Sequence, residues 1–318
     1  MPTRPQVIAL EEHYMDPEVK AHITGRDATR GAVGARLDDV GQGRIAEMDA
    51  AGIDIQVLSH GAPSVQRLDA ELAVRLARGA NDRLAETVQA HPDRFAGFAM
   101  LPTADPQASA DELERAVTRL GFKGAMVHGL TGSLFLDDRR FWPIFERAQA
   151  LDVPLYLHPA IPHPAVIEAY YKDYVDKYPN LLRAAWGFTV ETATQGIRMV
   201  LSDVFDTYPR LKIILGHLGE GLPFLLWRIN MALVRDGAGA TWFRDTFCEH
   251  FWITTSGFFS DPALLCCVQE LGVDRILFSV DYPFVENAPG TEWVHRIPLC
   301  AEDKAKILSG NVKRLLKM

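Results

Sequence analysis

The sequence predicts an α/β protein, and more narrowly a single (β/α)8 barrel of the TIM type. Short apolar runs, typical of buried strands, alternate along the chain with longer segments of helical period, which is the order that produces parallel βαβ units. There are eight such runs in 318 residues, which suits one closed barrel. No linker, composition break or charge block divides the chain, so we expect one domain over residues 1–318.

The eight strands are expected where runs of five to eight mostly apolar residues occur. They cover residues 6–13, 53–59, 95–101, 124–128, 154–158, 212–217, 251–256 and 275–281. An open, doubly wound sheet built from the same strands is the alternative architecture. The first run is not followed by a G-x-G-x-x-G segment, so nothing favours the dinucleotide-binding form of that sheet.

Six helices are predicted between the strands, over residues 69–91, 105–120, 138–151, 191–208, 222–234 and 261–271. Several start at an aspartate, such as Asp69, and several are followed by a helix-breaking glycine, such as Gly121. Two longer connections, near residues 16–40 and 160–187, follow strands. In a barrel they would lie on the active-site face, where long loops commonly carry function.

The composition excludes several classes of protein. Acidic residues outnumber basic ones by 41 to 33, which gives a net charge of −8 and argues against a nucleic-acid partner. No apolar run approaches the ~20 residues that cross a bilayer, and Glu11 and Glu12 interrupt the first apolar run too early for a signal peptide. The four cysteines lack C-x-x-C spacing. We therefore expect a cytoplasmic protein with no membrane partner.

Polar residues at the strand ends are the main functional signal. On the first strand Glu11 and His13 share one face, because side chains two residues apart point the same way, whereas Glu12 faces the other side and suits a structural role. The fifth, sixth and eighth strands end at His158, His217 and Asp281. In a barrel these ends converge on one mouth. Carboxylates and imidazoles together suit Zn²⁺ or Mn²⁺, so the set predicts a metal site.

Each of these residues also has a structural interpretation when it is taken alone. A single histidine at a strand end is more often a hydrogen-bonded residue than a ligand, and Asp281 alone suits the cap of a following helix. The joint occurrence at four strand ends is what favours a metal site. Five further histidines fall in predicted loops or at helix ends, where we expect solvent exposure: His60, His91, His163, His250 and His295.

Several motifs give the chain a family resemblance from about Val7 to Leu315. They are ALEEH at 9–13, YLHP at 156–159, ILGHLGEGLP at 214–223, WRI at 227–229, ITTSG at 253–257 and RILFSVDYP at 275–283. This set resembles the amidohydrolase superfamily, and more narrowly its non-oxidative decarboxylases of hydroxylated benzoates, of the γ-resorcylate type. The resemblance implies a carboxy-lyase that acts on a small aromatic carboxylic acid, and a homodimer or homotetramer.

The resemblance also implies roles at the metal site. Glu11, His13, His158 and Asp281 would bind one divalent ion, Zn or Mn, and His217 would sit beside it. Asp281 would deliver the proton that replaces the carboxyl group, with His217 assisting proton movement or holding the substrate. Binuclear relatives bridge two metals with a modified lysine at the end of strand four. Here Lys123 lies at the opposite end of that strand, which favours a single metal.

Four residues are candidates for substrate binding. Arg228 would lie near the substrate carboxylate, which a guanidinium fork fits, although a surface ion pair is an equal alternative. Trp186 and Tyr282 are possible walls for an aromatic ring, with core packing as the alternative. His128 stands where relatives of the γ-resorcylate type have an asparagine, so we expect a different substrate preference. Its alternative is a histidine packed away from the pocket.

Two other classes of function stay open. A metal-dependent hydrolase or hydratase on the same scaffold would use the ion to activate water rather than to chelate a phenolic acid. A metal-binding protein without catalytic activity is the third, because a fold alone does not fix a function. Release of carbon dioxide distinguishes the decarboxylase from the hydrolase or hydratase. A protein without catalytic activity would turn over no substrate.

Overall fold

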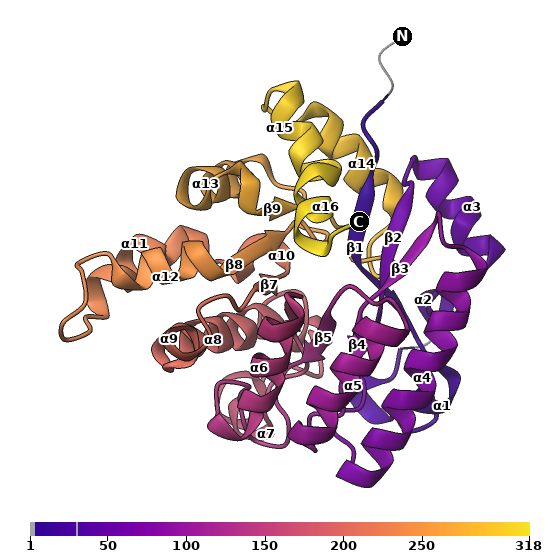
Figure 1. Ribbon diagram of the computed structural model, residues 1–318, viewed down its shortest axis with the longest axis horizontal. Helices are drawn as coiled ribbons and strands as arrows, with labels where there is room; N and C mark the ends of the chain where they lie inside the picture. The colour runs from indigo at the N-terminus through magenta and orange to yellow at the C-terminus, as the bar shows by residue number, and fades with distance from the viewer. Residues whose placement is uncertain (1–3, 30) are drawn as a thin grey trace.

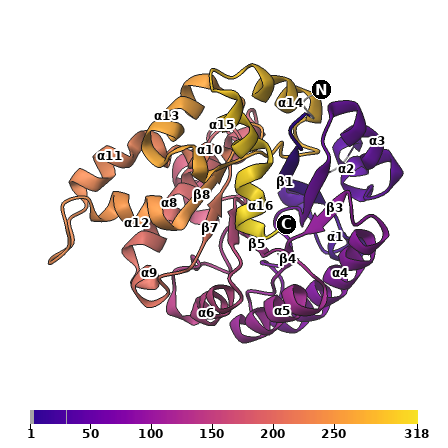
Figure 2. The same ribbon diagram turned by 45° about the horizontal axis from the view of Figure 1, so that its top comes forward.

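A computed structural model describes residues 4–29 and 31–318. Its strands lie at the centre, and the helices surround them (Figures 1 and 2). The strands are β1 (Ile8–Tyr14), β2 (Ile55–His60), β3 (Phe95–Gly97), β4 (Ala99–Met100), β5 (Ala125–His128), β6 (Leu155–His158), β7 (Ile213–Leu215), β8 (Phe251–Thr254) and β9 (Ile276–Leu277). Each pairs in parallel with its neighbour in the order β1-β2-β3 and β4 to β9.

These strands close into a barrel, which confirms the predicted (β/α)8 fold and excludes the open sheet. The predicted strand at 95–101 forms both β3 and β4, with Phe98 between them. The amide of Phe98 donates to the carbonyl of Leu58 across 2.9 Å, so this bend keeps both neighbours paired. At the other junction the amide of Leu10 donates to the carbonyl of Phe278 across 3.3 Å, which joins β1 to the chain after β9.

The six predicted helices are all present. They are α4 (Ala70–Ala90), α5 (Pro106–Arg119), α6 (Trp142–Leu151), α8 (Gly187–Leu201), α11 (Leu222–Ala232) and α13 (Asp261–Leu271). Asp69 and Asp105 cap α4 and α5 as expected, because each carboxylate accepts an amide of the first helical turn. The helix predicted over 191–208 is interrupted: α8 ends at Leu201, and a separate α9 covers Val204–Thr207.

Other helices were not predicted. They are α1 (Pro17–Lys20), α2 (Gly31–Asp38), α3 (Gln42–Ala51), α7 (Pro164–Val166), α10 (His217–Glu220), α12 (Trp242–His250), α14 (Asn287–Arg296), α15 (Ala301–Ala305) and α16 (Asn311–Leu316). Short 3₁₀ or π segments cover Gly25–Asp27, Arg139–Phe141, Ile167–Tyr171, Pro179–Leu182, Val273–Arg275 and Lys306–Gly310. The expected long loops at 16–40 and 160–187 thus contain helical turns of their own.

The core has two layers, inside the barrel and between barrel and helices. The inner layer packs side chains such as Leu10, Phe98 and Tyr156 against Val312 and Leu315 of α16, which lies over the centre of the ring in Figure 2. A larger cluster joins the outer strand faces to the surrounding helices. Among the described residues, no helix has both the length and the apolar character needed to span a bilayer.

Candidate metal centre

Four buried or half-buried side chains converge at one mouth of the barrel. Glu11 and His13 come from β1, His158 ends β6, and Asp281 follows β9. One possible ligand atom from each lies within 4.8 Å of the others. Nε2 of His158 is 3.3 Å from Oε1 of Glu11, and Nε2 of His13 is 3.3 Å from Oδ1 of Asp281. The ligand set predicted from the strand ends is therefore assembled in the structure.

The backbone of β1 is irregular at the first ligand. The pairing of β1 with β2 shifts between Leu10 and Glu12, which marks a bulge at Glu11. Glu11 has φ 74° and Asp281 has φ 72°, a left-handed conformation that non-glycine residues seldom adopt and that is common at functional sites. Both carboxylates thus reach the centre through a local departure from regular strand geometry.

The second nitrogen of each ligand histidine is held by a neighbour. Nδ1 of His158 donates to the carbonyl of Pro159 across 2.7 Å, and Nδ1 of His13 lies 3.2 Å from Oγ of Ser59. These contacts direct Nε2 of each ring toward the centre, the arrangement typical of metal-ligating histidine. Burial lowers the pKa of His158 well below its ordinary value, so its ring is neutral and keeps a lone pair for a metal.

Glu11 is held in the same way through one of its two oxygens. Oε2 accepts hydrogen bonds from the hydroxyls of Tyr156, Ser256 and Thr254. Burial raises the pKa of this carboxyl group. Oε1 of Glu11 and Nε2 of His13 are buried with no hydrogen-bond partner. Such atoms are costly in a protein interior, and a divalent cation would satisfy both. The residues present therefore fit a single divalent metal ion.

Glu12 faces away from the centre, as predicted. Its carboxylate accepts the amide of Val280 across 2.8 Å and that of Tyr282 across 3.2 Å. Burial raises its pKa to about 8. These bonds hold the backbone on either side of Asp281, so Glu12 has a structural role.

His217 lies beside the four ligands, on the turn that follows β7. Its Nε2 is 3.9 Å from both Oε1 of Glu11 and Oδ2 of Asp281, and its Nδ1 is 2.7 Å from Oε1 of Glu220. Burial lowers the pKa of His217, but the carboxylates of Glu220 and Glu11 outweigh this and raise it well above its ordinary value. The sequence did not single out Glu220 as a partner of this histidine.

His128 ends β5 and is also next to the ligands. Its ring centroid lies 4.8 Å from that of His158. The side chain is buried, and neither ring nitrogen has a hydrogen-bond partner. Burial, followed by the neighbouring His158, lowers its pKa well below the ordinary value. A neutral imidazole with two unused nitrogens is therefore available next to the centre.

The other substrate-binding candidates occupy different surroundings. Tyr282 is buried, with its ring 4.7 Å from the guanidinium carbon of Arg44, so core packing describes it better than a substrate wall. Trp186 is 53% exposed and lines an apolar cavity of about 900 Å³ with Leu218 and other side chains. Arg228 is exposed on α11, so its role stays a prediction.

An aromatic side chain that the sequence reasoning missed lies at the mouth. Phe284 follows Asp281 by three residues, and its ring centroid is 5.7 Å from that of His13. It is 43% exposed, so part of the ring is open to solvent. No motif marked this position, because an apolar residue in a loop carries no periodic signal.

Two histidines that were expected in solvent are instead buried. His60 is the last residue of β2, and its Nδ1 lies 2.8 Å from the carbonyl of Gly61. Burial lowers its pKa to about 4. His250 ends α12, where its Nδ1 lies 2.9 Å from the carbonyl of Leu211 and its ring stacks on Phe205. Both satisfy one ring nitrogen with a backbone carbonyl.

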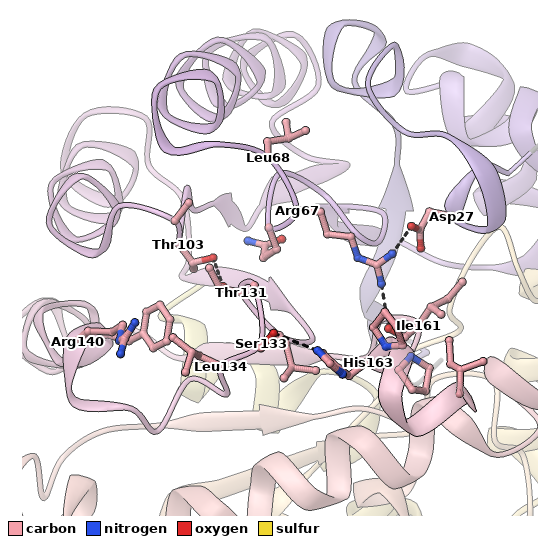
Figure 3. A pocket seen from close by; sticks show the side chains of 18 of the residues that line it. Asp27, Arg67, Leu68, Thr103, Thr131, Ser133, Leu134, Arg140, Ile161 and His163 are labelled. Carbon is pink, nitrogen blue, oxygen red and sulfur yellow. Dashed lines mark hydrogen bonds and ion pairs between the residues drawn. The ribbon is translucent and has the colours of Figure 1, made fainter. Parts of the chain in front are cut away.

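A cleft of about 840 Å³ opens on the same face of the barrel, among the segments that follow β1, β2, β4, β5 and β6. Figure 3 shows Arg67 reaching toward Asp27 and Ile161 across it. Arg140 at its rim bonds Asp138 across 2.8 Å. None of the four metal ligands lines this cleft. Its arginines contact the chain's own acceptors, so its charge is largely neutralised from within.

Comparison with known proteins agrees with the geometry. Residues 16–318 match the family model described as amidohydrolase. The γ-resorcylate decarboxylase of Polaromonas sp. is 42% identical over 98% of each chain. A solved 2,6-dihydroxybenzoate decarboxylase, complexed with 2,6-dihydroxybenzoate, has a TM-score of 0.91 and 39% identity, covering 99% of this chain and 100% of that one.

A second solved structure adds the metal. It is a dihydroxybenzoic acid decarboxylase from Polaromonas sp. with bound manganese and the inhibitor 2-nitroresorcinol. It has a TM-score of 0.88 and 40% identity, covering 98% of this chain and 97% of that one. The shared fold, the full-length similarity and the four-ligand centre agree, and the chain therefore belongs to the amidohydrolase family.

Proposed function

We propose that this protein is a metal-dependent, non-oxidative decarboxylase of a hydroxylated aromatic acid. The observation that carries the proposal is the four-ligand centre with His217 beside it, in a chain 42% identical to a γ-resorcylate decarboxylase over 98% of its length. The relatives named above act on or bind dihydroxybenzoates, or carry an inhibitor of similar shape. A substrate of the same class fits a mouth that combines metal ligands with a partly exposed aromatic ring.

Glu11, His13, His158 and Asp281 would hold one divalent ion, Zn or Mn. When bound, such an ion neutralises charge and provides a centre where a carboxylate and its neighbouring phenolate oxygen can chelate. The hydrogen bonds to Glu11, His13 and His158 keep the ligand atoms oriented before the ion arrives. An ortho-hydroxylated benzoate is therefore the preferred class.

The reaction replaces a carboxyl group on a ring carbon by hydrogen. Carbon dioxide leaves, the electron pair of the broken bond stays with the ring, and that carbon gains one proton. Asp281 delivers this proton, since it is one of the four side chains at the mouth and is 16% exposed there. His217, with Nε2 3.9 Å from Asp281, assists proton movement or holds the substrate. Its bond to Glu220 favours the protonated imidazole.

The substrate ring has several proposed contacts. Phe284 offers a partly exposed aromatic ring near His13, and Trp186 lines an apolar cavity together with Leu218, the residue after His217. Arg228, exposed on α11, is proposed to bind the substrate carboxylate, whose geometry a guanidinium fork suits. His128 is proposed to contact a ring substituent through an unpartnered nitrogen.

Assembly and compartment are part of the same proposal. We expect a homodimer or homotetramer. Phe224, Trp227 and Met231 on α11 are 80%, 70% and 61% exposed, and exposed apolar patches commonly mark protein contacts. Figure 1 shows α11 and α12 projecting from the barrel. The four free cysteines fit a reducing, cytoplasmic compartment. Sedimentation of the purified protein tests the assembly.

The function is tested by adding Mn²⁺ or Zn²⁺ to metal-stripped protein and presenting 2,6-dihydroxybenzoate and related ortho-hydroxybenzoates. We expect loss of the acid and release of carbon dioxide. The matched control is 3,5-dihydroxybenzoate, which has no hydroxyl next to its carboxylate and should not react. If the metal-loaded protein turns over none of the ortho-hydroxybenzoates, the proposal is contradicted. Hydration or hydrolysis of another substrate, without carbon dioxide, favours the hydrolase or hydratase alternative.

A further inference from the structure

Glu12 lies between two metal ligands in the sequence but binds the backbone around a third. The side chain is fully buried. Its two oxygens accept the amides of Val280 and Tyr282, the residues on either side of Asp281. A buried backbone amide that lost its acceptor would be left unsatisfied, which is costly in a protein interior. One side chain from β1 therefore holds both ends of the segment that presents Asp281.

These bonds replace regular strand pairing at this point. β9 ends at Leu277, so the chain from Phe278 to Asp281 has no regular ladder to fix it. Asp281 itself has φ 72°, a conformation that persists only where the surroundings impose it. The amide of His13 also donates to the carbonyl of Tyr282 across 2.7 Å. Together these contacts set the position of Asp281 relative to β1.

Arg44 of α3 holds the other side of the same junction. Its guanidinium group is fully buried and donates to the carbonyl of His13. It also donates to Oε1 of Gln56 across 3.3 Å, and Nε2 of Gln56 lies 3.5 Å from Oε2 of Glu12. The ring of Tyr282 packs against the same guanidinium group. Arg44 and Glu12 are thus linked through Gln56, behind the strands that carry three of the four ligands.

We propose that Glu12 is a positioning residue for the metal centre, supported by Arg44 through Gln56. Glu12 fixes the spacing between Glu11 and His13 on β1 and Asp281 in the segment after β9, and so sets the affinity for the metal. Glu12 would not itself be a ligand, because its oxygens are directed at backbone amides. The inference depends on the metal centre and holds whichever reaction that centre performs.

The test compares Glu12→Gln with a matched buried carboxylate elsewhere. Glutamine has a single oxygen, so its amide nitrogen would face one of the two backbone amides. The control is Glu112→Gln on α5. Glu112 is also buried and accepts bonds of 2.7 Å from Asn81 and 2.8 Å from Arg115, but it contacts no ligand segment. Both full-length variants are stripped of metal, and Mn²⁺ affinity is measured by competition with a chelator.

We expect Glu12→Gln to bind Mn²⁺ roughly 10- to 100-fold more weakly. A loss of this size is typical when a residue that holds a metal ligand in place is replaced. Glu112→Gln should unfold at a lower urea concentration than the parent, yet bind Mn²⁺ with the same affinity. The visible spectrum of bound Co²⁺ at saturation should change only in Glu12→Gln, which a general loss of stability would not produce. Unchanged affinity and an unchanged spectrum in Glu12→Gln overturn the proposal.

Arg44→Lys keeps the test valid if Glu12→Gln does not fold. It retains the positive charge but cannot reach His13 and Gln56 together. A weaker Mn²⁺ affinity and an altered Co²⁺ spectrum in this variant support the positioning role. Parent-like values for both measurements contradict it.

Discussion

His217 and Glu220 are joined by a 2.7 Å contact between Nδ1 and Oε1, within one turn after β7. His217, Leu218 and Glu220 all have positive φ angles there. This strained turn points Nε2 of His217 at the metal ligands while Glu220 holds the opposite nitrogen. The pair therefore fixes both the orientation and the charge of the imidazole nearest to the four ligands.

Glu220→Gln should slow the reaction without emptying the metal site. The amide keeps a similar shape but no longer favours the imidazolium form, so proton movement through His217 becomes less effective. We expect kcat to fall by roughly 10²-fold, the lower end of general acid–base effects, with Mn²⁺ content unchanged. Steady-state kinetics and metal analysis on the same preparation measure both. A kcat within twofold of the parent contradicts the role of the pair.

Removing a ligand should affect metal content and activity together. His158→Ala and Asp281→Ala each delete one of the four ligand side chains, so bound metal per chain should fall and turnover should be lost. His295→Ala is the matched control, because His295 is an exposed histidine on α14. Full occupancy and full activity in both ligand variants would remove the basis of the metal-site assignment.

The strand ends predicted the ligand set because a closed barrel brings the carboxyl ends of its strands to one face, whatever the conformation of the loops. His158 and Asp281 are 123 positions apart in sequence, yet they meet because His158 ends β6 and Asp281 follows the end of β9 by four residues. The bulge at Glu11 could not be predicted, since a register shift leaves no periodic signature. Glu12 was correctly read as structural, but its partner Val280 lies 268 residues away, and sequence alone does not reveal such a contact.

Side-chain orientation explains the other misses. Tyr282 and Phe284 are both aromatic and both follow Asp281 closely. The structure buries Tyr282 under Arg44 and leaves Phe284 half-exposed beside His13. Nothing in their spacing distinguishes the two. Helices such as α12 and α14 were missed because short helices after long loops depend on packing more than on intrinsic propensity.

His128→Asn should change the substrate preference more than the stability. The ring is buried beside His158 with two unpartnered nitrogens, whereas asparagine is smaller and offers an amide instead. We expect the ratios of kcat/KM among substituted ortho-hydroxybenzoates to change severalfold, while the urea midpoint moves little. Identical ratios in parent and variant would mean that His128 does not contact the ring.

Glu191→Gln should stabilise the protein at alkaline pH. Burial raises the pKa of Glu191 to about 7, and its Oε1 has no hydrogen-bond partner. The folded state therefore holds this proton more tightly than the unfolded state does. Stability from this group is full below about pH 4.5 and is lost as pH rises toward 7. Because the pKa of Glu191 rises from an ordinary 4.5 to about 7, the deprotonated side chain lowers the free energy of unfolding by about 3 kcal/mol above pH 7.

Urea unfolding of parent and Glu191→Gln at pH 5.5 and pH 8 measures this effect. Comparing the two proteins at each pH cancels the titration of all other groups. Part of the effect is already present at pH 5.5, so the advantage of the variant should grow by roughly 2 kcal/mol from the lower pH to the higher. An advantage that is equal at both values, or a parent that is the more stable at pH 8, shows that Glu191 is not the source.

The most direct test of the decarboxylase assignment is the fate of the ring carbon in heavy water. The metal-loaded protein is incubated with an ortho-hydroxybenzoate in deuterium oxide, and product incubated alone serves as the control for spontaneous exchange. We expect one deuterium at the carbon that lost its carboxyl group, with one carbon dioxide released per product, and almost complete loss of this labelling in Asp281→Asn. Consumption of the substrate with neither ring deuterium nor carbon dioxide would contradict the assignment.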